Sequence, residues 1–147
     1  KYDFFEIYDG YIYKNEEIRL EAFKNSHGEL EKSFGFVVTT NDLKIVFSGD
    51  TAPSMKLIEK SKGADILVHE VFSETGFLKK TPDWQIYHAA HHTSPKQLGS
   101  IANKIKPKKL VLSHILYWGA TESEIKLEVA KYYDGDIEVA TDLLRIH

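Results

Sequence analysis

The feature that most constrains the fold is an alternation of short apolar runs with helix-like segments along most of the chain. Apolar runs at residues 43–47, 65–69 and 109–113 have the length and composition of strands buried in a sheet. Helix-like segments lie between them: one covers residues 53–61, and another begins near Pro95, directly after potential capping residues. This alternation predicts an α/β fold in which one sheet is covered by helices.

Turn signals predict further strands at both ends of the chain. The first third is rich in aromatic and β-branched residues and is expected to be mostly β structure. Dipeptides that favour tight turns, Asp9-Gly10 and Asn41-Asp42, predict two hairpins. The expected strands, besides the apolar runs above, cover residues 4–8, 11–13, 18–23, 34–40, 137–140 and 143–146.

The second half of the chain is expected to contain one loop and a third helix. The loop covers residues 72–90. The helix begins at a capping box formed by Thr121 and Glu124, and its buried side carries Ile125 and Val129. Because the sequence has no repeat, low-complexity tract or linker, residues 1–147 are expected to form a single domain.

Composition excludes several classes of protein. The formal net charge of −3 gives no general surface for binding polyanions. The sequence has no cysteine, so any metal ion must be held by His, Asp or Glu, and disulfides are excluded. No apolar run reaches the ~18 residues that cross a membrane, and the N-terminus does not resemble a signal peptide. A cytoplasmic protein without a membrane partner is therefore expected.

Two apolar runs end in side chains suited to binding a metal ion. Asp50 follows the run 43–47 in a glycine-containing turn, and its two carboxylate oxygens could bridge two cations. His114 ends the run 109–113, and neutral imidazole is a common zinc ligand. The residues alone leave simpler alternatives open. Asp50 could cap a helix or turn, and His114 could be a hydrogen-bonded histidine at the rim of the sheet.

A third strand end and a histidine cluster supply candidates for proton transfer. Glu70 follows the run 65–69, where the alternative is a solvated residue at the end of a strand. Three of the seven histidines lie within five positions before the predicted helix at Pro95: His88, His91 and His92. We interpret His92 as a loop residue at the helix N-terminus, where the helix dipole favours a neutral imidazole. Paired with a carboxylate such as Glu70, it would be a suitable proton donor.

Taken in order, these segments resemble the metallo-β-lactamase superfamily and, more narrowly, its ribonuclease Z and arylsulfatase-like branch. The order and approximate spacing hold from about residue 34 to the end of the chain. The matching segments are Ser48-Gly49-Asp50-Thr51, His69-Glu70, His92-Thr93-Ser94 and Leu112-Ser113-His114. Members of the superfamily fold as an αββα sandwich with a binuclear metal site at the rim between two sheets. The resemblance implies that this chain is the C-terminal half of such a sandwich.

The resemblance also implies a role for each matching residue. Asp50 corresponds to the aspartate that bridges the two metal ions, and His114 to the last histidine ligand. His92 corresponds to a general acid that is not a ligand, and Glu70 to the carboxylate that orients it. Two divalent ions, zinc or else manganese or iron, would activate a bridging water and polarise the ester, while His92 protonates the leaving group.

The expected substrates are small-molecule or nucleotide esters, with phosphodiesters as the first choice. RNA remains open as a substrate but is not favoured. The alternative is a non-catalytic α/β binding module in a larger assembly. Metal analysis of the longest natural form of the protein would separate these hypotheses.

The sequence departs from the family in its main metal motif, His-x-His-x-Asp-His, which none of its histidines forms. Asp50 and His114 are too few ligands to enclose two ions. We therefore expect an N-terminal part, or a second chain such as another copy, to complete the site, and this chain alone to be inactive. No role is assigned to His88 or His91, and His27 is interpreted as a residue of a turn between strands.

Overall fold

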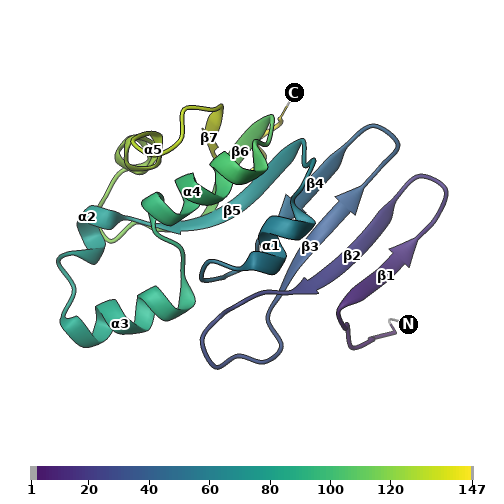
Figure 1. The fold of residues 1–147 in the computed structure, drawn as a ribbon, viewed down its shortest axis with the longest axis horizontal. Coiled ribbons are helices and arrows are strands. Elements are labelled where there is room, and N and C mark those ends of the chain that lie inside the picture. Colours follow the sequence, from purple (N-terminus) through teal and green to yellow (C-terminus); the bar gives the residue numbers. More distant parts are fainter. Residues whose placement is uncertain (1–2, 147) are drawn as a thin grey trace.

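The computed structural model describes residues 3–146, which form a seven-stranded sheet and five helices (Figure 1). The strands lie in the sheet in the same order as in the sequence. The elements are β1 (Gly10–Lys14), β2 (Arg19–Lys24), β3 (Phe34–Thr39), β4 (Lys44–Phe47), α1 (Met55–Lys60), β5 (Ile66–Phe72), α2 (Glu74–Phe77), α3 (Pro82–His91), α4 (Pro95–Ile105), β6 (Lys109–Leu116), α5 (Glu122–Ala130) and β7 (Ile137–Val139). The predicted α/β class is confirmed.

The first four strands form an antiparallel meander, and the last four are parallel. β1 to β4 pair antiparallel, whereas β4, β5, β6 and β7 pair parallel. The predicted hairpin at Asn41-Asp42 joins β3 to β4. Its turn is fixed by the hydroxyl oxygen of Thr40, which accepts the backbone N–H groups of Asp42 and Leu43 at 3.3 and 3.1 Å.

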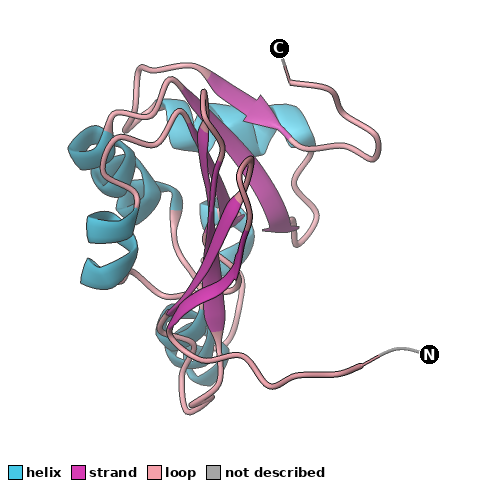
Figure 2. Ribbon diagram, turned by 90° about the vertical axis from the view of Figure 1, so that its right-hand side faces the viewer, coloured by secondary structure: helices cyan, strands magenta, loops and turns pink. Residues whose placement is uncertain are grey.

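The strand order explains why the helices cover one face of the sheet. Parallel strands are joined by right-handed crossovers in nearly all proteins. When successive crossovers move across the sheet in one direction, as they do here from β4 to β7, their helices lie on the same face. α1 and α4 cross this face in Figure 1, and Figure 2 shows most helices on one side of the strands.

The core lies between these helices and the sheet. Leu57 of α1, Leu98 of α4 and Ile125 of α5 are fully buried, together with Leu67 and Leu110 from the central strands. Burying each such side chain stabilises the fold by about 1.5–3 kcal/mol. The helix after Thr121 has the expected capping box, and the helix at Pro95 has its N-cap at Ser94, where a capping box is present as well.

The opposite face of the sheet carries apolar side chains that remain partly exposed. Val37, Val46 and Leu67 point toward the helices and are at most 5% exposed. Their neighbours alternate to the other face, because successive side chains of a strand point in opposite directions. On that face Phe47 is paired in register with Phe36 and is 39% exposed. At β3 and β4, the sheet therefore has one covered face and one apolar face that is partly open.

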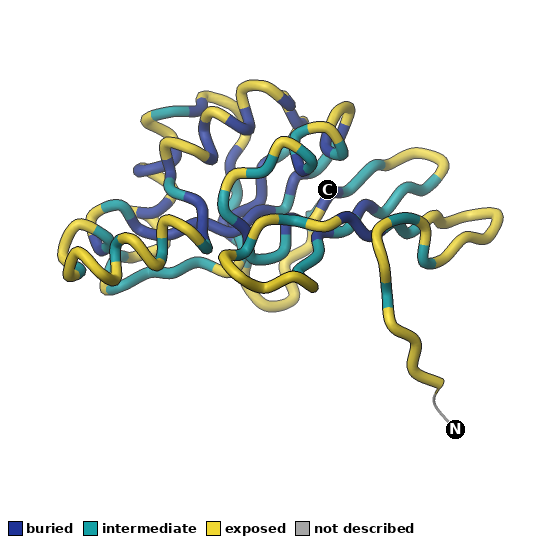
Figure 3. Tube along the Cα trace, turned by 60° about the horizontal axis from the view of Figure 1, so that its bottom comes forward, coloured by how far each residue is buried: buried dark blue, intermediate teal, exposed yellow. Residues whose placement is uncertain are grey.

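Three predicted elements are wrong. Residues 4–8 are not a strand, so the predicted hairpin at Asp9-Gly10 does not form. β1 pairs with β2 instead. The turn between them is at Asn15, whose side chain accepts two backbone N–H groups. Residues 143–146 are also outside any strand. The predicted loop at 72–90 contains α2 and most of α3. Exposed residues predominate in α3 (Figure 3), so its sequence lacks the apolar period that marks a buried helix.

Among residues 3–146, no helix is both long and apolar enough to span a bilayer.

Candidate active site

The turn after β4 holds Asp50 at the rim of the sheet. Gly49 has a φ of +61°, and a β-carbon there would lie 2.4 Å from the carbonyl oxygen of Phe34, so the close turn requires glycine. The side-chain amide of Asn25 donates to the carbonyl oxygen of Ser48 at 2.7 Å. These contacts fix the backbone from which the Asp50 carboxylate projects.

His114 occupies a β-bulge in β6. Glu70 pairs with Ser113 and the next residue, Val71, pairs with Ile115, so His114 is the extra residue of the bulge. Its φ is +43°, a left-handed conformation that is costly for a side chain with a β-carbon. Bulges redirect a side chain at a strand end, and unfavourable backbone conformations concentrate at functional sites.

The Asp50 and His114 side chains meet at the open rim. Oδ2 of Asp50 lies 3.1 Å from Nε2 of His114, with the side chains 39% and 51% exposed. They line a cleft of about 250 Å³, whose other walls include Phe36, Phe47 and Val68 from the open face. Carboxylate oxygen and imidazole nitrogen both suit zinc and similar divalent ions. Within residues 3–146, no group of three or more such side chains is arranged to hold an ion.

Glu70 and His92 form a second pair beside the first. Oε1 of Glu70 accepts from Nδ1 of His92 at 3.2 Å and from the backbone N–H of Thr51 at 3.0 Å. Glu70 is 1% exposed and His92 is 8% exposed. With Nδ1 donating to the carboxylate, Nε2 of His92 is the ring atom left for exchanging a proton with another group. The predicted hydrogen bond between Glu70 and His92 is confirmed.

The four predicted site residues converge. The ring centroids of His92 and His114 lie 6.1 Å apart, which places the Glu70–His92 pair next to the Asp50–His114 pair. β4, β5 and β6 are adjacent parallel strands, so the residues that follow or end them meet at one edge of the sheet. His92 lies between α3 and the N-cap of α4, close to its predicted position.

Two of the other histidines among residues 3–146, His69 and His27, hold backbone groups in place. His69 is fully buried, with Nδ1 bonded to the carbonyl oxygen of Glu70 at 2.7 Å, and burial lowers its pKa. Nδ1 of His27 contacts the carbonyl oxygen of His91 at 2.9 Å, which ties the segment after β2 to the end of α3. Burial is also the main cause that lowers the pKa of His88.

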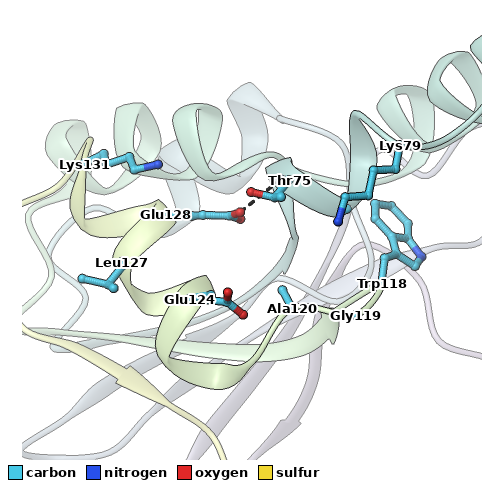
Figure 4. A pocket seen from close by; sticks show the side chains of 10 residues that line it. Thr75, Lys79, Trp118, Gly119, Ala120, Glu124, Leu127, Glu128 and Lys131 are labelled. Atoms are coloured by element: carbon cyan, nitrogen blue, oxygen red, sulfur yellow. Dashed lines mark hydrogen bonds between the residues drawn. The ribbon is translucent and has the colours of Figure 1, made fainter.

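A separate pocket of about 290 Å³ lies between α2 and α5 (Figure 4). Among the described residues that line this pocket, Glu128 is the one carboxylate that is nearly buried. It accepts hydrogen bonds from the backbone N–H groups of Glu74 and Thr75 at 2.8 and 3.0 Å. These hydrogen bonds occupy the carboxylate in holding the start of α2. We therefore place the candidate active site at the other cleft.

Comparison with known proteins identifies the class. A family model described as the β-lactamase superfamily domain matches residues 5–115. The chain belongs to this superfamily, in agreement with the resemblance of its motifs. The metallo-β-lactamase fold protein YhfI from Bacillus subtilis has a TM-score of 0.68 and 18% identity, and the match covers 85% of this chain and 48% of that one.

Sequence relatives then identify the branch. A ribonuclease Z from Archaeoglobus fulgidus is 29% identical over 103 residues, which cover 70% of this chain and 32% of the relative. A ribonuclease Z from Mycobacterium bovis is 24% identical over 140 residues, which cover 93% of this chain and 50% of the relative. Within the superfamily, the chain lies in the ribonuclease Z-like branch. It spans half or less of the length of these two relatives.

Proposed function

We propose that this chain supplies part of the active site of a metal-dependent hydrolase that acts on a phosphodiester or a related ester. The observation that carries the proposal is the meeting of two side-chain pairs at one rim. The Asp50–His114 pair has an N···O distance of 3.1 Å, and the Glu70–His92 pair has one of 3.2 Å. The first has the donor atoms of a metal site, and the second has the geometry of an oriented general acid.

Asp50 and His114 would hold one side of a site for divalent ions, with zinc, manganese or iron as the candidate metals. Such ions supply an activated water and a positive charge that stabilises the transition state. His92, protonated on both ring nitrogens, would donate its Nε2 proton to the leaving-group oxygen, while its Nδ1–H group stays hydrogen-bonded to the Glu70 carboxylate. His92 must regain its Nε2 proton after each turnover, from solvent or from the attacking water.

The remaining ligands, in this proposal, come from a segment outside these 147 residues or from a second chain. Two observations support it. Asp50 and His114 contribute two donors, whereas a catalytic zinc ion usually has three protein ligands. The open face of the sheet also presents Phe36 and Phe47 next to the cleft, and large exposed apolar surfaces mark contacts with other structure.

The roles can be separated by measuring metal content and hydrolysis in the longest natural form of the protein. His92→Ala should reduce turnover of a chromogenic phosphodiester by about 100-fold or more, with metal content unchanged. Asp50→Asn should reduce metal content itself, because the neutral amide is a poorer ligand. Loss of metal in His92→Ala would show that His92 is a ligand. Full metal content and activity in Asp50→Asn would refute the metal site.

A further inference from the structure

A line of four rings leads from the surface of α3 to the candidate metal site. Trp84 stacks on His88 with centroids 5.4 Å apart and planes at 22°. His88 is followed by His92 at 5.8 Å, and His92 by His114 at 6.1 Å. The first three are spaced four residues apart, so they share one side of α3 and its C-terminal end. A second pair, Tyr87 and His91, stacks beside them at 4.1 Å.

The outer rings of this line are exposed. Trp84 is 54% and Tyr87 is 49% exposed, and no residue of α3 is buried. Together with Asp83 they line an open groove of about 400 Å³. α3 is held instead by polar contacts, such as the side-chain amide of Gln85 donating to the carbonyl oxygen of Lys80 at 3.0 Å. The aromatic side chains therefore contribute little to the core, although each presents a large flat surface.

The charges beside the line favour one orientation of a ligand. The ammonium of Lys80 lies 4.8 Å from the centroid of Trp118, which in turn lies 4.6 Å from His88. This places a cation beside the middle of the line, where a further phosphate group, belonging to the leaving group and separate from the reacting ester, is favoured. The Asp83 carboxylate lines the outer groove, where a second anion is disfavoured and a neutral ring that carries N–H donors is favoured.

We propose that Trp84 and Tyr87 form a stacking subsite for a planar ring in the leaving group of the substrate. This inference rests on the proposed function, because the leaving group is the part that must lie next to the general acid, His92. The ring line ends at His92 and His114, so a substrate whose ester lies at the metal site extends its leaving group along α3. Stacking on aromatic side chains contributes about 1–3 kcal/mol per base, with little dependence on base identity.

The planar ring could belong to a nucleobase or to a simple aryl alcohol, and binding measurements can distinguish them. Three phosphate monoesters serve as probes in calorimetric titrations of the longest natural form: adenosine 5′-monophosphate, ribose 5-phosphate and phenyl phosphate. The adenine nucleotide should bind about tenfold tighter than ribose 5-phosphate, as expected for one stacking contact. Trp84→Ala and Tyr87→Ala should bring the ratio of these two affinities close to one, whereas Trp84→Phe should keep much of the preference for the nucleotide.

Tyr13→Ala is the matched control, because Tyr13 is 53% exposed but lies in β1. It should leave the ratio unchanged. A Trp84-dependent gain for phenyl phosphate without one for the nucleotide would assign the subsite to aryl esters. Equal binding of all three probes to the unsubstituted protein would overturn the proposal. So would a change of oligomeric state on Trp84→Ala in sedimentation, because α3 would then be an interface between chains.

Catalysis is measured separately, so that the two proposals can fail independently. The substrates are two short oligonucleotides, identical except that the second nucleotide of the leaving group, which can reach Trp84, carries adenine in one and no base in the other. Both release the same kind of sugar oxygen, so a rate difference reports the base and not the leaving-group pKa. Base-dependent binding without hydrolysis would refute the proposed function and keep the subsite. Hydrolysis at equal rates, with equal binding, would keep the function and refute the subsite.

Discussion

From the backbone conformation of His114 we predict how two substitutions change the free energy of unfolding, independently of any ligand. His114 is the extra residue of a β-bulge and has a φ of +43°. Any side chain with a β-carbon is strained there, and glycine is not. His114→Ala and His114→Gly both remove the imidazole, so the difference between these two variants isolates the cost of the β-carbon.

The magnitude follows from three contributions. The left-handed conformation costs a residue with a β-carbon about 1–2 kcal/mol. Replacing His114 with glycine removes this cost, but the greater freedom of glycine in the unfolded chain offsets about 0.5–1 kcal/mol of the stabilisation. Loss of the pair with Asp50 removes about 0–1 kcal/mol at most, because both side chains are more than a third exposed. His114→Gly should therefore be about 1 kcal/mol more stable than His114→Ala and close to the unsubstituted protein.

The assay is urea denaturation of the three proteins, repeated as thermal unfolding. For a chain of this size, 1 kcal/mol corresponds to a shift of about 2–4 °C in Tm. Ser113, the neighbouring residue, is the control, since its φ is not positive. There the order should reverse, with Ser113→Gly less stable than Ser113→Ala by about 0.5–1 kcal/mol. An alanine variant at 114 as stable as the glycine variant would refute the argument that the bulge is strained.

Three further variants test the scaffold of the site. Gly49→Ala should destabilise the protein by about 2 kcal/mol or more in urea, because φ is +61° and the new β-carbon would meet the Phe34 carbonyl oxygen; an unchanged midpoint would contradict this. Glu128→Gln should cost about 1–2 kcal/mol, because a neutral acceptor holds the two backbone N–H groups of α2 less strongly, and hydrogen exchange there should accelerate. Burial lowers the pKa of His69, so the unfolded state binds the extra proton and stability should fall as pH decreases below about 6.5. In His69→Gln, the slope of the unfolding free energy against pH should decrease by the contribution of up to one bound proton. An unaltered slope would show that other groups cause the pH dependence.

The sequence allowed the site to be predicted because its residues follow strong local signals. Asp50, Glu70 and His114 each follow or end an apolar strand, and adjacent parallel strands bring such positions to one edge. The helix after His92 was predicted from Ser94 and Pro95, which do form its capped start. Local pattern and tertiary position coincide in these elements. The roles of these residues in metal binding and catalysis remain predictions.

Elsewhere the local pattern was a poor guide, for physical reasons. α3 buries no residue, so no apolar period marks it, although Thr81 and Pro82 do have the signature of a helix start. The aromatic line on α3 could not be predicted while the segment was interpreted as a loop. The bulge at His114 depends on the pairing of β6 with β5, which no local pattern reveals.

The one-directional order of the strands has a consequence for how the active site would be assembled. Because the helices lie on one face, the other face is open, and its residues Phe36, Phe47 and Val68 also wall the cleft beside Asp50 and His114. A layer docked on that face would displace water from the apolar surface and enclose the candidate metal site in the same step. Association and activation would then be one event. Excluding water would bury the apolar surface, and it would also strengthen the charge interactions at the rim by lowering the local dielectric.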